Sequence, residues 1–107
     1  MLEALDGPSK QFAVTITNTV PVEVKAGASA FTERKVITLQ NSKLDTNTGE
    51  FYVYFADEGV IPSAGDLSTK GFIQGKNTKQ SYEASGSQAV FIMAVTGSVD
   101  VRGAERA

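Results

Sequence analysis

Apolar and polar residues alternate along most of this chain with a period of two, which is typical of β-strands with one buried face. In the first such segment, Phe12, Val14 and Ile16 share one face, and small or polar residues occupy the other. Turn-forming residues separate this segment from the later ones. The pattern predicts strands over residues 11–18, 20–25, 34–40, 51–55, 71–75, 79–84, 88–95 and 99–102.

Local signals predict where some of these strands lie in a sheet. Residues 88–95 read QAVFIMAV and are apolar on both faces, so we expect them to form the most central strand. Pro21 cannot donate a ladder hydrogen bond, which favours an edge position for residues 20–25. The glycine-serine pair at 97–98 is a two-residue hairpin signal, so we expect residues 99–102 to pair with the strand before it.

Helical periodicity is hard to find. Residues 1–6 are the best helix candidate and are equally compatible with an extended arm, while residues 56–70 have the glycines and proline of a long surface loop. We therefore predict an all-β fold: a single-domain β-sandwich or a small jelly-roll-like barrel of about seven or eight short antiparallel strands. The expected division is an N-terminal arm over residues 1–10, the sandwich over 11–102 and a polar C-terminal tail over 103–107.

The segment FYVYF at residues 51–55 is the most unusual strand, because four of its five residues are aromatic. Phe51, Val53 and Phe55 point to one face and can fill a core, whereas Tyr52 and Tyr54 point to the other. Three interpretations stay open for the tyrosines: a second inner surface of a central strand, an interface with a subunit or partner, or a sugar platform. Carbohydrate sites favour tryptophan, and the chain contains none.

The amino-acid composition argues against several classes of protein function. Hydrophobic residues make up 41% of the chain and charged residues 21%, as in globular rather than disordered proteins. The net charge is −2 and the basic residues are scattered, so we do not expect a nucleic-acid partner. No apolar run is long enough to span a bilayer, and the start of the chain does not resemble a signal peptide, so we expect folding in the cytosol and no membrane partner.

Candidate chemistry is sparse. The chain has no cysteine and no histidine, which removes the usual thiol nucleophile, general base and transition-metal ligands. Residues 45–50 superficially resemble a calcium loop, but glycine stands fifth and Ala56 occupies the twelfth position, which leaves at most an adventitious calcium site. Asp57, Glu58 and Asp66 do not mark an enclosed cleft. We expect no enzyme activity, no cofactor and no built metal site.

Residues 33–105 resemble small β-sandwich virion proteins of tailed bacteriophages. The strand ERKVITLQN leads into FYVYF, and the segment KGFIQGKNTKQSY follows after a variable loop. QAVFIMAV, a glycine turn and VDVRGAERA then close the chain, as the closing strands do in that family. A long loop before Phe51 and a glutamine at position 74, where a proline is expected, depart from the family pattern.

The resemblance implies a capsid decoration, or cement, protein that binds across capsid-subunit seams on the virion surface without catalysis. It implies the major capsid protein as partner and a symmetric homo-oligomer, with a trimer favoured. We expect subunit contacts through Tyr52, Tyr54 and Tyr82, and an apolar arm contact through Leu2 and Leu5. The alternatives are a low-copy neck, tail or head-fibre-anchoring component, and a carbohydrate-binding module.

Overall fold

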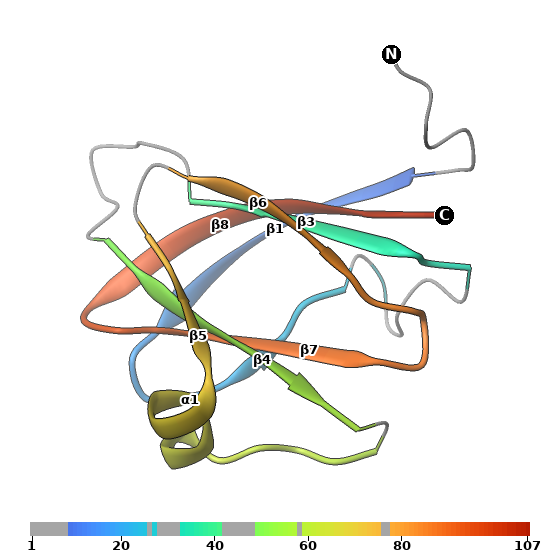
Figure 1. Ribbon diagram of the computed structural model, residues 1–107. Helices are drawn as coiled ribbons and strands as arrows, with labels where there is room; N and C mark the ends of the chain where they lie inside the picture. Colours follow the sequence, from blue (N-terminus) through green and yellow to red (C-terminus); the bar gives the residue numbers. More distant parts are fainter. Residues whose placement is uncertain (1–8, 26, 28–32, 42–48, 58, 76–77) are drawn as a thin grey trace.

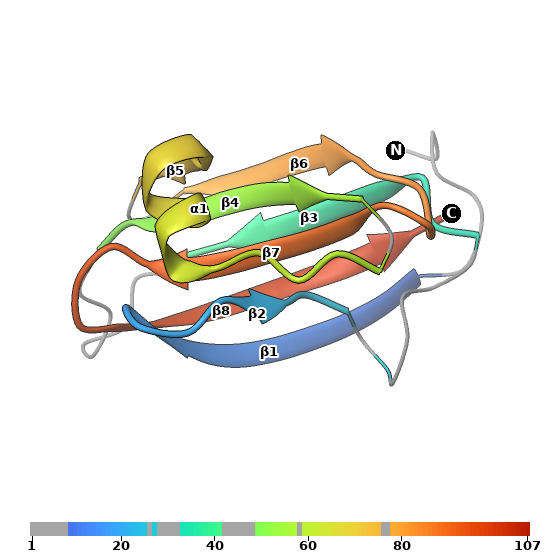
Figure 2. The ribbon, with the colours of Figure 1, turned by 90° about the horizontal axis from the view of Figure 1, so that it is seen from below.

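The computed structural model describes residues 9–25, 27, 33–41, 49–57, 59–75 and 78–107, and these form an all-β fold. The predicted fold class is confirmed: eight strands make two four-stranded antiparallel sheets, in the orders β1-β8-β3-β6 and β2-β7-β4-β5. The sheets lie face to face, and one short helix covers part of the second sheet (Figures 1 and 2). The elements are β1 (Ser9–Thr17), β2 (Val22–Glu23), β3 (Val36–Gln40), β4 (Phe51–Ala56), α1 (Ala64–Lys70), β5 (Phe72–Gln74), β6 (Lys79–Glu83), β7 (Ala89–Ala94) and β8 (Ser98–Arg106).

The main core lies between the two sheets. It is built from the apolar positions that alternate along each strand, and the polar positions between them face outward. Phe51 and Val53 of β4 are fully buried in it, as the period of FYVYF predicted. The buried members of this core are Ile16, Val24, Ile37, Leu39, Phe51, Val53, Ala84, Val90, Ile92, Ala94, Val99 and Val101.

Strand β7 is central in its sheet and buried on both faces, as its sequence predicted. Val90 and Ile92 point into the main core. Phe91 and Met93 point the opposite way and join a second, smaller core with Leu67 of α1. A strand that is apolar on both faces therefore needs a cover on each side, and α1 provides the second one.

The predicted hairpin between residues 88–95 and 99–102 is wrong. β7 and β8 belong to different sheets, and β8 pairs with β1 on one side and β3 on the other. Gly97 adopts a positive φ of 62° in the turn that carries the chain from one sheet to the other. A tight turn fixes the local backbone but not whether the next strand returns to the same sheet. The edge position predicted for β2 is confirmed.

The expected C-terminal tail is also wrong, because β8 continues to Arg106. Ala104 and Glu105 are buried, and Gly103 pairs with Phe12 across the ladder to β1. A Cβ atom at position 103 would lie 2.5 Å from Phe12 Cζ, so the Phe12 ring occupies the space that the glycine leaves. Ser9 and Lys10, assigned to the arm, begin β1, and residues 1–8 lie outside the described residues.

Residues 56–70 are not wholly a loop, since α1 spans nearly the last half of them. A capping box begins the helix: Asp66 N donates to Ser63 Oγ (3.2 Å), and Ser63 N donates to Asp66 Oδ2 (3.1 Å). Lys70 in the last turn suits the negative end of the helix dipole, and Leu67 is fully buried. The Ser-x-x-Asp pattern of Ser63 and Asp66 is a signal for a helix start that the sequence analysis did not consider.

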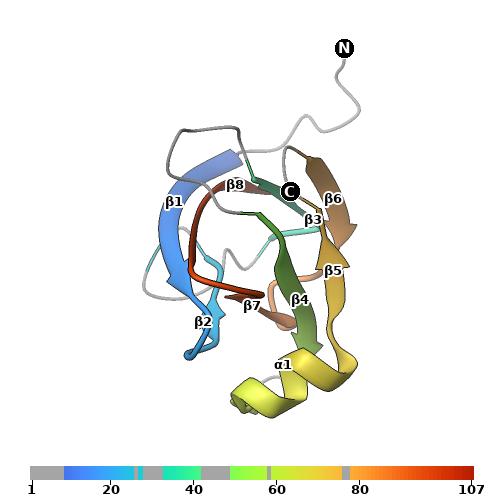
Figure 3. The ribbon, with the colours of Figure 1, turned by 90° about the vertical axis from the view of Figure 1, so that its left-hand side faces the viewer.

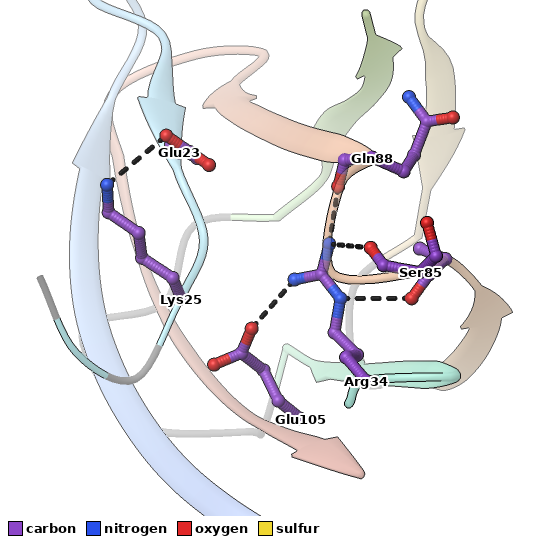
Figure 4. A network of polar contacts seen from close by, with 7 residues as sticks. Glu23, Lys25, Arg34, Ser85, Gln88 and Glu105 are labelled. Atoms are coloured by element: carbon purple, nitrogen blue, oxygen red, sulfur yellow. Dashed lines mark hydrogen bonds and ion pairs between the residues drawn. The ribbon is translucent and has the colours of Figure 1, made fainter. Parts of the chain in front are cut away.

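A buried ion pair lies at one end of the sandwich, between the segment that precedes β3 and strand β8 of the same sheet (Figure 4). Arg34 Nη1 donates to Glu105 Oε2 of β8 at 2.8 Å, and both side chains are fully buried. The same guanidinium donates to the carbonyls of Ala84 (3.0 Å), Ser85 (2.8 Å) and Gln88, which lie in the connection from β6 to β7. These bonds compensate for the desolvation of both charges.

Arg34→Met should lower the free energy of unfolding by about 3–5 kcal/mol, because it leaves the Glu105 carboxylate without the guanidinium it faces. Chemical denaturation measures the loss. Lys25→Met is the matched control, since it breaks the half-exposed pair between Lys25 Nζ and Glu23 Oε1 at 3.3 Å and should cost about 1 kcal/mol or less. Equal losses in the two variants would contradict a dominant role for Arg34.

Candidate interaction surface

The face of FYVYF that carries the tyrosines is partly covered by the protein's own helix. Tyr52 and Tyr54 are both half-buried and pack against the small core that Leu67 forms with β7. Gly71, which follows α1, lets the chain turn closely from the helix into β5, because a Cβ atom there would lie 2.6 Å from Leu67 O and 3.3 Å from Tyr52 Cβ. The tyrosines therefore have a structural role, and only the remaining part of each ring is available for an interface.

Strands β5 and β6 lie at the same edge of the sandwich (Figure 3), and Tyr82 belongs to β6. Its hydroxyl donates to Gln74 Oε1 at 3.0 Å, and its ring meets Phe55 edge-on with the centroids 5.7 Å apart. Gln74 in turn donates through Nε2 to the carbonyl of Leu39 at 2.8 Å, across to the other sheet. Burial raises the pKa of Tyr82 above its usual value near 10. The predicted subunit contact would have to use the exposed remainder of this half-buried ring.

Leu2 and Leu5, the predicted arm contacts, lie outside the described residues. Most of the calcium-loop-like segment at 45–50 is outside them as well. Within the described part of the chain, no group of three or more acidic side chains is arranged to hold a metal ion.

The strongest surface feature is one that the sequence analysis did not single out. Large apolar side chains are exposed only in the half of the described molecule that contains the sheet β2-β7-β4-β5 and the connections leading into it. We call these residues the exposed apolar set: Val20, Val60, Ile61, Phe72 and Ile73. Phe72 and Ile73 are consecutive in β5, so their side chains project from opposite faces of an edge strand.

The outer face of the other sheet is different, since polar side chains pair across its strands. Thr15 Oγ1 donates to Asp100 Oδ1 at 2.7 Å, and the hydroxyls of Thr38 and Ser81 lie 2.9 Å apart. This contrast between the two sheets makes the half with the exposed apolar set the better candidate for a binding surface.

A shallow depression of about 540 Å³ lies beside Arg34, but its charged group is already engaged. The guanidinium is held by Glu105 and three backbone carbonyls, so it does not present an anion site. The depression is lined by Arg34, Lys35, Val36, Glu83, Ala84, Ser85 and Gln88.

Comparison of the chain with protein-family models, with curated proteins and with solved structures finds no match. None of the described helices is long and apolar enough to cross a bilayer. Interpretation of the surface therefore depends on its own residues.

Tyr82→Phe should remove a late-titrating component from the ultraviolet absorbance titration of the tyrosines. Because burial raises the folded-state pKa of Tyr82 above the unfolded value, its contribution to stability is complete below about pH 10 and is lost as the pH rises through the folded pKa. Tyr54→Phe keeps Tyr82 and is the control, in which the late component should persist. Identical titration curves for the two variants would contradict the assignment of the late-titrating component to Tyr82.

Proposed function

We propose that the protein is a non-catalytic structural component of a tailed-phage virion, which decorates the capsid and stabilises it by binding across capsid-subunit seams. The observation that carries the proposal is the exposed apolar set, which gives one half of a polar-surfaced β-sandwich a means of binding another protein. The motif resemblance over residues 33–105 supplies the class of partner, the major capsid protein.

We expect the protein to stabilise the capsid shell through its binding equilibrium with the assembled state. A protein that binds only the assembled shell lowers the free energy of that state, so the shell becomes harder to disassemble. Stable interfaces bury about 800 Å² per partner, and most of their energy comes from a few large apolar or aromatic anchors. Ile61 is the best candidate for such an anchor on the shell, because it is 83% exposed in the connection between β4 and α1.

The exposed remainders of Tyr52 and Tyr54 can extend the same surface, since both lie beside the small core under α1. Synthesis in the bacterial cytoplasm agrees with a chain that has no cysteine. The proposed oligomer would repeat this surface around the capsid, so each copy could contact more than one capsid subunit.

The copy number per particle tests the decoration role. In purified virions of the phage that encodes the chain, quantitative mass spectrometry should give a simple lattice ratio to the major capsid protein. A few copies per particle would instead favour the neck, tail or head-fibre alternative. Absence of the chain from the particles would refute a virion role.

Deletion of residues 1–8 should leave a folded domain that no longer remains on the shell, because we expect Leu2 and Leu5 to bind a neighbouring subunit. Co-sedimentation with undecorated capsids measures retention, and circular dichroism checks folding. The double variant Leu2→Ser with Leu5→Ser should reproduce the loss. Glu3→Ser with Asp6→Ser is the matched control and should bind as the wild type does; wild-type binding by the deletion variant would exclude the arm contact.

A further inference from the structure

Strand β5 is a short edge strand that has neither a charge nor a proline to prevent pairing. Edge strands of monomers commonly carry charges or proline, which prevent another strand from adding to the sheet. β6 has exposed Lys79 and Glu83, and Pro21 precedes β2. By contrast, the segment from Gly71 to Gly75 contains neither a charge nor a proline.

The side chains of β5 are exposed although they are apolar. Phe72 is 64% exposed and Ile73 58%. The Phe72 ring meets the Phe55 ring edge-on, with the centroids 6.3 Å apart, and Ile73 lies opposite Tyr52 on the outer face of the sheet. A strand added beyond β5 would cover both side chains, one on each face.

We propose that β5 binds the β5 strand of a second copy of this chain, antiparallel and around a two-fold axis, so that the two sheets join. Placing Phe72 opposite its own equivalent sets Ile73 opposite Gly71 of the other copy. Gly71 has an extended backbone (φ −71°, ψ 153°), so the strand conformation continues through it. Since Gly71 has no side chain, the incoming Ile73 can lie beside its backbone, next to the last turn of α1, where Leu67 O is 2.6 Å from the position that a Cβ atom at Gly71 would take.

A second copy can occupy this edge without like-charge repulsion. In a two-fold contact each surface meets itself, so a charged edge would oppose like charges. No charged residues oppose each other in this register, and the nearest flanking charge, Lys70, would face Gln74. Because the two-fold contact uses the β5 edge of both copies, no third copy can add at this edge. The contact therefore predicts a dimer rather than the trimer that the resemblance favours.

The size of the contact predicts its strength. β5 has three residues, so the pairing buries less than the roughly 800 Å² per partner of a standard interface. We expect a concentration-dependent dimer with a dissociation constant on the order of micromolar or weaker. A role for this dimer on a capsid shell rests on the proposed function. The existence of the dimer does not, because dimerisation can be measured on the purified chain alone.

Sedimentation velocity over a range of concentrations tests the dimer. The wild type should dimerise, and Ile73→Lys should raise the dissociation constant at least ten-fold, because it places a charge on the pairing edge. Ile61→Lys makes the same change at a more exposed site away from β5 and should dimerise as the wild type does. Unchanged far-ultraviolet circular dichroism and melting temperature would exclude unfolding as the cause. A wild type that stays monomeric, or a wild-type oligomer that Ile73→Lys leaves intact, would overturn the proposal.

Cross-linking tests the register. The chain has no cysteine, so Phe72→Cys introduces a single thiol. Paired residues in antiparallel strands have Cα atoms about 4.5–5.5 Å apart, within the range for a disulfide. Mild oxidation should give a covalent dimer for Phe72→Cys and not for Ile61→Cys. Equal cross-linking of the two variants, or none for Phe72→Cys, would refute the self-pairing of residue 72.

Discussion

The buried guanidinium of Arg34 is the interaction on which the arrangement of the sandwich depends. It binds Glu105 in one sheet and the carbonyls of Ala84, Ser85 and Gln88, where the chain passes toward the other sheet. Gln88 then donates through Nε2 to the carbonyl of Ala56 at 2.5 Å, which extends the connection to the end of β4. A continuous series of polar contacts thus runs from β8 to β4. Because each buried charge needs these partners, the connection has one favourable geometry.

A second set of polar contacts holds β5, the edge strand of the sheet β2-β7-β4-β5 that carries the exposed Phe72 and Ile73. β5 is short, yet Gln74 joins it to Leu39 in the other sheet and accepts a hydrogen bond from Tyr82. This anchorage keeps Phe72 and Ile73 in a fixed strand although their side chains face solvent. A rigid apolar edge loses little conformational entropy when it binds, which favours its use as a binding surface.

The strands could be predicted from the sequence because burial of one face produces a period of two, and Phe51, Val53, Ile37 and Leu39 follow that rule. The failures have a common origin in long-range partners. Glu105 looked like part of a polar tail because its partner, Arg34, is 71 residues away in the sequence. The turn at Gly97 did not reveal that β8 joins the other sheet, since its partners β1 and β3 are distant in sequence.

The candidate surface was less predictable than the fold. Tyr52 and Tyr54 were chosen because they faced away from the main core, but exposure depends on what covers a face, and here α1 covers part of it. Conversely, Phe72 and Ile73 stood in an ordinary apolar strand segment, and only their edge position exposes them. Edge and centre are properties of strand order, which residue patterns within one strand do not specify.

In the proposed function, the half of the molecule with β2, β7, β4 and β5 makes the contacts with other proteins, while the polar sheet faces solvent. A cryo-electron microscopy reconstruction of the particles tests this most directly. We expect the sandwich on the outside of the shell, with Ile61 against a capsid subunit and β5 beside the β5 of a second copy. Density in which Phe72, Ile73 and Ile61 face solvent, with the polar sheet against the shell, would contradict it.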